Sequence, residues 1–218
     1  LWPMPDGNAI TRRKLYPDAA EYDRRRFGTL AGRWRNRQKM AAVRKALDRI
    51  GDTGLLLDAP CGSGRFFELL SKRGVRFVGT DLSEAMLLGA RAKANGAGES
   101  GLVMADINAL PFADGAFDTL MCIRFLFHLS PEERVTALRE MSRVTRGYLV
   151  LDYRLFFSGK NILRLIVSRF KHKRPLYRPN KREMLGELAR AGLEAVAIFP
   201  VTRVFSDKYI VLCGKRDR

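Results

Sequence analysis

The chain has 218 residues, of which 46% are hydrophobic and 29% charged, a balance that excludes a disordered or fibrous protein. At this length a chain buries enough surface for a full core without metal or disulfide support, as one domain or as one domain with an appended lid. No apolar run approaches the roughly 18 residues needed to span a bilayer.

The formal net charge of +17 is carried by the two ends of the chain. Residues 51–150 hold 11 Lys or Arg against 12 Asp or Glu, whereas residues 1–50 hold 13 against 5 and residues 151–218 hold 16 against 6. Such an excess favours an anionic partner or surface. The three cysteines are odd in number and lack a CxxC spacing, which predicts a reducing, cytoplasmic compartment.

In chain order, residues 1–50 are expected to form an irregular arm and a helical lid over Ala19–Ile50, where apolar residues recur at spacings of three to four. Strands and helices then alternate over short connections, which predicts a parallel sheet covered by helices on both faces. The expected strands are Leu55–Asp58, Val75–Thr80, Leu102–Ala105, Phe117–Ile123 and Tyr148–Leu151, and the expected helices are Arg65–Arg73, a helix capped by Ser83 and running to about Asn95, and Pro131–Val144.

The end of the chain departs from this alternation. A helix at Lys181–Ala191 precedes two long strands, Gly192–Val201 and Val204–Gly214, which are joined by a tight link and must therefore be antiparallel.

The segment from Leu55 to Arg65 combines an apolar strand, Asp58 and a glycine-containing turn that opens a helix. Glycines at this place let the backbone turn sharply and let a ligand approach bare amides at a helix N-terminus. Further acids, Asp81 and Asp106, end the next two strands, and Asp81 lies near the spacing at which dinucleotide folds place a ribose-binding carboxylate. The third glycine of the dinucleotide fingerprint would fall at Phe67, which disfavours a nicotinamide oxidoreductase.

With these motifs the chain resembles the class I S-adenosylmethionine-dependent methyltransferases, in the broad group that includes the quinone-biosynthesis methyltransferases. The likeness covers about residues 40–153 and rests on Leu55–Gly64, Val78–Ser83, Ala105–Ile107 with Leu110–Phe112, and Phe117–Asp118 with Phe127–Leu129. It implies a Rossmann-like three-layer α/β sandwich with a mostly parallel seven-stranded sheet and an antiparallel C-terminal hairpin. Residues 51–218 would form the methyltransferase domain, with a basic helical insertion at about 155–180.

The resemblance also implies S-adenosylmethionine as cofactor and a residue for each part of it. Gly62 and Gly64 would approach the methionine part and ribose, Asp58 the amino group, and Asp81 the ribose hydroxyls. Asp106 and the Ile107 amide would contact adenine. The full expected cofactor set is Asp58, Ala59, Pro60, Gly62, Gly64, Asp81, Leu82, Asp106, Ile107 and Arg124. Pro60 stands where the family usually has the first glycine of its loop, which removes one backbone donor.

Candidates for catalysis and acceptor binding are fewer. His128 is the first candidate for a general base and Tyr153 the second, while His128 could equally pack or cap a helix. Tyr22, Trp34, Phe125 and Arg154 are candidate substrate contacts. Packing of the lid is the alternative for Trp34, and a solvated loop pair is the alternative for Tyr153 and Arg154. No metal site is expected.

Three functions remain open: methylation, expected on oxygen, of a small-molecule or lipid-like acceptor, methylation of RNA, and cofactor binding without catalysis. The charge favours RNA, but the sequence contains no RNA-binding signature, and Met121–Phe125 replaces the Asn/Asp-Pro-Pro-aromatic motif of base amino-methyltransferases. The segment Phe156–Arg174 predicts a basic helix with an apolar stripe, which would lie either as a lid on the sheet or in an anionic membrane interface. The expected location is the cytoplasm. The membrane alternative for this helix would add peripheral binding at the inner membrane face.

Overall fold

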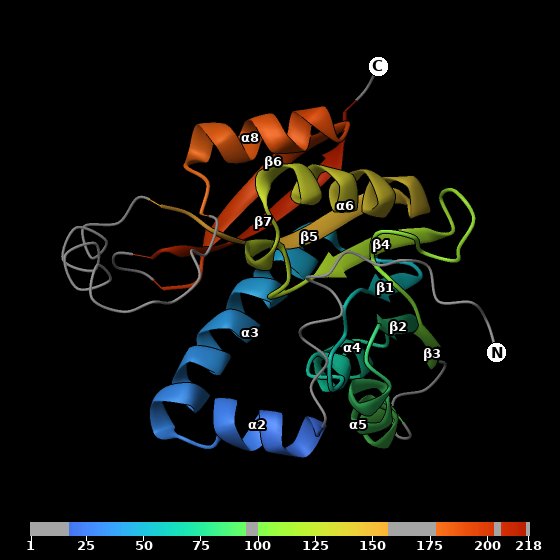
Figure 1. Ribbon diagram of the computed structural model, residues 1–218, viewed down its shortest axis with the longest axis vertical. Coiled ribbons are helices and arrows are strands. Elements are labelled where there is room, and N and C mark those ends of the chain that lie inside the picture. The colour runs from blue at the N-terminus through green and yellow to red at the C-terminus, as the bar shows by residue number, and fades with distance from the viewer. Residues whose placement is uncertain (1–17, 95–99, 157–177, 203–205, 217–218) are drawn as a thin grey trace.

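The computed structural model describes residues 18–94, 100–156, 178–202 and 206–216. Its centre is a seven-stranded sheet in the order β3-β2-β1-β4-β5-β7-β6 (Figure 1). Strands β1 to β5 pair in parallel, and β7 pairs antiparallel with both β5 and β6. The strands are β1 Leu56–Asp58, β2 Phe77–Asp81, β3 Ser100–Met104, β4 Phe117–Cys122, β5 Thr145–Arg154, β6 Leu193–Pro200 and β7 Lys208–Lys215. The expected fold class is confirmed.

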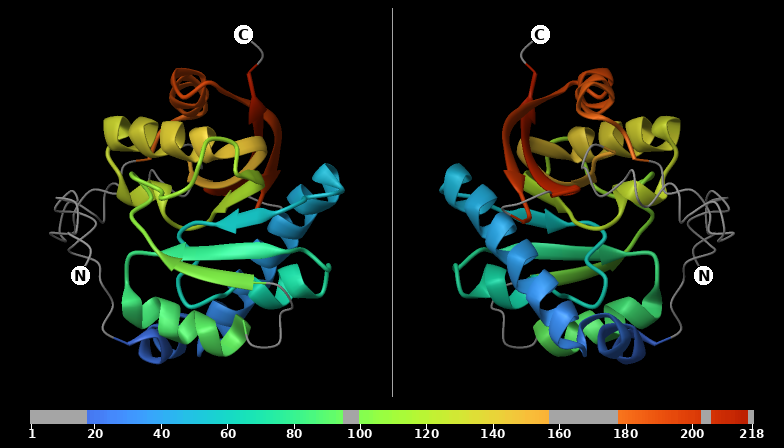
Figure 2. Two further views of the ribbon diagram at one scale, coloured as in Figure 1. Left: turned by 90° about the vertical axis from the view of Figure 1, so that its right-hand side faces the viewer. Right: turned by 90° about the vertical axis from the view of Figure 1, so that its left-hand side faces the viewer.

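Helices cover both faces of the sheet and make three layers (Figures 1 and 2). One face carries α3, α4 and α5, and the other carries α6 and α8. The short helix α2 packs against α3 and α5. The helices are α2 Ala19–Phe27, α3 Leu30–Ile50, α4 Phe67–Ser71, α5 Glu84–Ala94, the 3₁₀ turn η1 Leu126–His128, α6 Pro131–Val144 and α8 Lys181–Arg190.

The side chains of the buried strands point alternately to the two faces of the sheet, so they contribute to two separate hydrophobic cores. In β1, Leu56 packs toward α3 and α4, while Leu57 joins the core under α6 and α8. Both side chains are fully buried. Because successive side chains of a strand point to opposite faces, a central strand with helices on both sides has no polar face and becomes apolar throughout.

Helix α6 shows why some boundaries are readable in the sequence. The Ser130 hydroxyl accepts the Glu133 amide, the Glu133 carboxylate accepts the Ser130 amide, and Pro131 occupies the first turn. Local caps of this kind define a helix start without help from the rest of the fold.

The expectation of one helical segment over Ala19–Ile50 is wrong in one respect. The segment is broken at Gly28 and Thr29 into α2 and α3. The Thr29 hydroxyl accepts the Gly32 amide at 3.0 Å and starts a new helix. A Cβ atom on Gly28 would lie only 2.5 Å from the carbonyl oxygen of Arg24, so the corner needs glycine. The break turns α2 back toward the sheet.

The expected basic helix over Phe156–Arg174 lies outside the described residues, apart from Phe156 itself. In the described part of the chain, no helix combines the length and apolar character needed to cross a membrane. The same residues contain no cluster of His, Cys, Asp and Glu side chains that could hold a metal ion.

Candidate functional site

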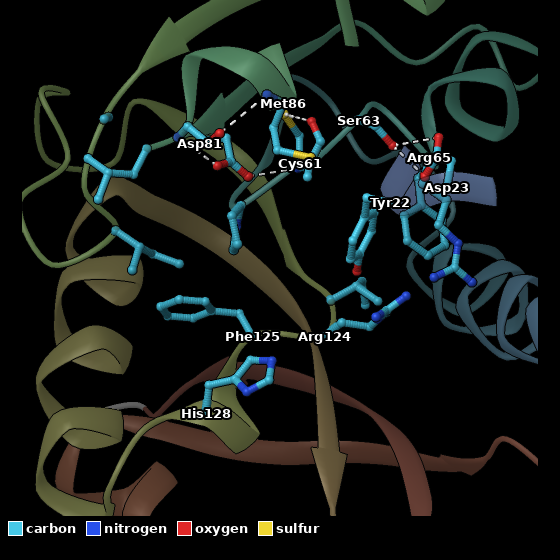
Figure 3. A pocket seen from close by; sticks show the side chains of 18 of the residues that line it. Tyr22, Asp23, Cys61, Ser63, Arg65, Asp81, Met86, Arg124, Phe125 and His128 are labelled. Carbon is cyan, nitrogen blue, oxygen red and sulfur yellow. Dashed lines mark hydrogen bonds between the residues drawn. The ribbon is translucent and has the colours of Figure 1, made fainter. Parts of the chain in front are cut away.

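A pocket opens where the carboxyl ends of β1, β2 and β4 meet (Figure 3). In open α/β sheets this edge is the usual place for a ligand, because the loops that follow the strands diverge there. The inner walls come from the loops after four strands: Pro60–Ser63 after β1, Leu82 after β2, Ile107 after β3 and Arg124 after β4. Gly62 of the glycine turn and Asp81, one of the strand-end acids, thus lie at one site.

Asp81 is an acid in the inner wall of the pocket. One carboxylate oxygen accepts the Gly62 amide at 3.0 Å, and the other accepts the Ser83 amide at 2.9 Å. Burial raises the pKa of Asp81 above its usual value, and the hydrogen bonds from Ser83, Gly62 and Leu82 partly oppose this shift. The backbone therefore holds the carboxylate in one orientation at the pocket wall.

Asp58, at the end of β1, is a second acid close to the pocket. Its side chain is fully buried, and neither oxygen has a hydrogen-bond partner among the described residues. Burial first, and the nearby charge of Asp81 second, raise the pKa of Asp58 well above its usual value. A buried, unpaired carboxyl group of this kind is stabilised by a cationic ligand group nearby.

Helix α2 forms the outer wall. Tyr22 and Asp23 of this helix line the pocket (Figure 3), and so does Phe27 at its end. The Asp23 carboxylate accepts the Ser63 hydroxyl at 2.9 Å and the Lys93 ammonium at 2.8 Å. These contacts join α2 to the glycine turn and to α5, so α2 is held in place by charge as well as by packing.

The wall opposite Asp81 is formed by the loop after β4 (Figure 3). Arg124 has a φ of 69°, which is uncommon for a residue other than glycine and marks a constrained backbone. Its guanidinium lies 5.7 Å from the ring centroid of Tyr22. Phe125 and His128 complete this end, with the His128 imidazole beside the pocket (Figure 3).

Several expected site residues lie in the walls of this pocket, and others do not. The expected residues that line it are Tyr22, Pro60, Gly62, Asp81, Leu82, Ile107, Arg124, Phe125 and His128. Asp58, Ala59, Gly64, Asp106, Trp34, Tyr153 and Arg154 are not among its lining residues. Ala59 is buried behind the loop, and Trp34 is 54% exposed on α3. Asp106 is buried, and one of its carboxylate oxygens accepts both the amide and the side-chain nitrogen of Asn108 at 2.9 Å.

Tyr153 does not reach the pocket, contrary to the expectation of a base there. Its ring is buried in the core under α6 and α8, and its hydroxyl donates to Glu187 at 3.3 Å. Burial raises the pKa of Tyr153 well above its usual value. The phenol therefore stays protonated at neutral pH and cannot act there as a base. The cause is the alternation of β5, which directs Tyr153 to one face and Asp152 and Arg154 to the other.

Gly64 contributes to packing rather than to the pocket wall. Its φ is 69°, and a Cβ atom would lie 2.7 Å from the Phe67 ring and 3.1 Å from the Cα of Ala90. We expect Gly64→Ala to destabilise the fold by about 2 kcal/mol or more, because strain at positive φ and overpacking add. Gly186→Ala is the matched control, since Gly186 lies in α8 with nothing within 4 Å and alanine favours a helix. Urea unfolding of both variants checks this, and an unchanged midpoint for Gly64→Ala would contradict the assignment.

Other pocket residues were not expected from the sequence. Asp23, Ser63, Arg65 and Met86 all line the pocket. The Arg65 guanidinium lies 4.4 Å from the ring centroid of Phe27 and donates to Asn36 on α3. For Arg65, the position directly after the glycine turn was a signal in the sequence that it could lie at the site. Asp23 and Met86 gave no such signal, because they reach the pocket through the packing of α2 and α5.

The buried carboxyl groups of the site fit S-adenosylmethionine, because its sulfonium and amino groups are both cationic. The unpaired Asp58 and the raised pKa of Asp81 show carboxyl groups that gain from positive charge nearby. Gly62 has a φ of 56° and nothing within 4 Å of where a Cβ would stand, so a ligand can approach its backbone closely.

Comparisons with known proteins identify a matching domain and related chains. A family model described as a methyltransferase domain matches residues 57–151. Demethylmenaquinone methyltransferase of Thermus thermophilus is 36% identical over 143 residues, which cover 57% of this chain and 61% of that protein. Ubiquinone biosynthesis O-methyltransferase of Methylococcus capsulatus is 30% identical over 166 residues, which cover 68% of this chain and 69% of that protein.

Among solved structures, magnesium protoporphyrin IX methyltransferase of Synechocystis with bound S-adenosylhomocysteine aligns with a TM-score of 0.76 at 20% identity. The alignment covers 91% of this chain and 95% of that one, and it shows a shared fold. The chain spans only 50% of the length of another curated relative, a putative methyltransferase of Encephalitozoon cuniculi. From the matched domain, the relatives and the arrangement of the pocket, we conclude that the chain belongs to the S-adenosylmethionine-dependent methyltransferase family.

Proposed function

We propose that this protein transfers a methyl group from S-adenosylmethionine to an oxygen atom of a small-molecule or lipid-like acceptor. The observation that carries the proposal is the pocket itself, with Asp81 on one side and His128, Phe125 and Arg124 on the other (Figure 3). The name of one relative, ubiquinone biosynthesis O-methyltransferase, supports oxygen as the methylated atom. The name of another, demethylmenaquinone methyltransferase, supports a quinone-related acceptor.

Within this proposal the cofactor is held by the strand-end residues. Asp81 accepts the ribose hydroxyls, Asp58 and the backbone of Gly62 hold the methionine part, and Asp106 and Ile107 hold adenine. When bound, S-adenosylmethionine supplies an electrophilic methyl group on a sulfur that leaves as a neutral thioether. The protein contributes orientation and the exclusion of water, for which Tyr22 and Phe27 of α2 form the outer wall.

His128 is the proposed base. Its imidazole accepts the proton of the acceptor hydroxyl as the oxygen forms its bond to the methyl carbon. The imidazole is supported by the Phe127 ring, whose centroid lies 4.2 Å from its own. General base catalysis contributes about 10²- to 10⁴-fold in comparable sites.

We expect His128→Gln to lower kcat about 10²- to 10⁴-fold while leaving cofactor affinity unchanged, because the imidazole moves a proton and does not hold the donor. The measurement is methyl transfer from radiolabelled S-adenosylmethionine to a series of phenols of decreasing pKa. An acceptor that is already ionised needs no base, so the defect should shrink along the series. Equal rates for wild type and variant with the least acidic phenol would refute the role of His128.

The same assay decides the class of acceptor. Phenols, a lipid extract and total RNA are offered in parallel, since the charge of +17 keeps RNA as the second candidate. Label recovered on phenols or lipids supports the proposal, and label recovered on RNA alone overturns it. Cofactor binding without label on any acceptor would favour the third possibility, a non-catalytic binding protein.

A further inference from the structure

Two cations occupy directly opposed positions at the ends of β5 and β7. Arg154 of β5 and Lys208 of β7 are register partners in the antiparallel pair. Like charges placed directly opposite one another across neighbouring strands destabilise a sheet. Burial is the first cause that lowers the pKa of each side chain below its usual value. Holding these two cations together therefore lowers the stability of the folded protein.

The two neighbouring carboxylates each form an ion pair with another cation. Asp152 is fully buried, one of its carboxylate oxygens pairs with Lys39 of α3, and the other has no hydrogen-bond partner among the described residues. Asp207 pairs with Arg178 at 3.5 Å. The Arg154 Nε is buried and has no hydrogen-bond partner among the described residues. The positive charge of Arg154 and Lys208 is thus only partly compensated by the part of the protein that the structure describes.

The Arg154 guanidinium is held in place and adjoins the acceptor end of the pocket. Its central carbon lies 3.7 Å from the ring centroid of Phe127, and that ring lies against the His128 imidazole at 4.2 Å. His128 and Arg124 both line the pocket (Figure 3). Arg124 lies close enough for its charge to lower the pKa of Arg154 and of Lys39. The stack of Arg154, Phe127 and His128 therefore runs from the cation pair to the pocket.

We propose that Arg154 and Lys208 form a subsite for an oxyanion, a carboxylate or a phosphate, carried by the methyl acceptor. A guanidinium fork matches the two oxygens of such a group, and a ring beneath it restricts its orientation. The anion would relieve the repulsion between these two cations across β5 and β7. This inference rests on the proposed function, because it names a property of that acceptor.

The test uses the full chain loaded with S-adenosylhomocysteine, with inorganic phosphate and acetate as separate probes. Each is titrated at constant ionic strength against chloride, and the midpoint of thermal unfolding reports binding by linkage. We expect a saturable rise with at least one probe. The rise with phosphate, with acetate or with both identifies the oxyanion that the subsite accepts. Arg154→Gln/Lys208→Gln should bind the effective probe about tenfold more weakly or worse, because hydrogen bonds to charged groups are lost.

The matched control is Lys45→Gln/Arg49→Gln, which removes the same charge from exposed positions of α3. It should keep the wild-type response. Lys208→Gln alone covers the case in which the double variant fails to fold. Equal losses in control and test variants, or no rise above chloride in the wild type, would overturn the subsite. Binding of the probe together with failure of methyl transfer to oxygen would instead leave the subsite standing and refute the proposed reaction.

Discussion

Replacing Asp81 with alanine should weaken the binding of S-adenosylmethionine at least about 100-fold. A carboxylate that accepts two ribose hydroxyls makes two charged hydrogen bonds, each worth about 1.5–3 kcal/mol. The amides of Gly62 and Ser83 orient both carboxylate oxygens, so the carboxylate is preorganised before the ligand binds. Calorimetric titration measures the change, and wild-type affinity in the variant would show that the cofactor site is elsewhere.

Two further variants separate charge from structure. Asp114→Ala removes a carboxylate from an exposed loop residue and should leave cofactor affinity unchanged. Asp81→Asn keeps the shape but must turn its NH₂ group toward the amide of either Gly62 or Ser83, so it should also bind weakly. Because burial raises the pKa of Asp81, the wild-type affinity should fall on acidification at a higher pH than that at which an exposed aspartate becomes protonated.

Replacing Glu187 with glutamine should destabilise the protein by about 3–5 kcal/mol, the cost of leaving a buried charge uncompensated. Arg134 is almost fully buried between α6 and α8, and its Nε and terminal nitrogen donate to the two oxygens of Glu187 at 2.9 and 2.7 Å. In a chain of this length such a loss lowers the unfolding midpoint by more than about 6 °C. Calorimetry and urea unfolding measure it.

The control is the ion pair of Arg190 and Glu132 between the same two helices, which lies at the surface. Glu132→Gln should change stability little, because solvent screens an exposed pair. The double variant Arg134→Met/Glu187→Leu should recover most of the lost stability, since apolar residues of similar volume can replace a buried pair. A Glu187→Gln protein as stable as wild type would show that the buried pair contributes little.

Much of the site could be predicted because its signals are local. The turn from Pro60 to Gly64 follows an apolar strand, and Asp81 stands at the end of the next. Once the sheet is parallel, these ends must meet at one edge, whatever the details of packing. The caps of α6 and α8 are likewise encoded within four residues, Ser130 to Glu133 and Asn180 to Glu183.

The face of the sheet to which each side chain of β5 points could not be predicted in the same way. Because this strand is buried on both faces, its apolar residues run without alternation and do not indicate which face any of them occupies. Only the register with β4 and β7 directs Tyr153 into the core and Arg154 toward Lys208.

By itself, then, the sequence determined the succession of strands and helices along the chain, the glycine turn and the acids at the strand ends, because each depends on neighbours in the chain. Tertiary structure alone decided how α2 is attached beside the pocket, where Asp23 meets Ser63 and Lys93. It also decided the burial of Arg134 against Glu187, 53 residues away. These contacts join residues whose separation in sequence carries no periodic signal, so they form only when helices and sheet pack together.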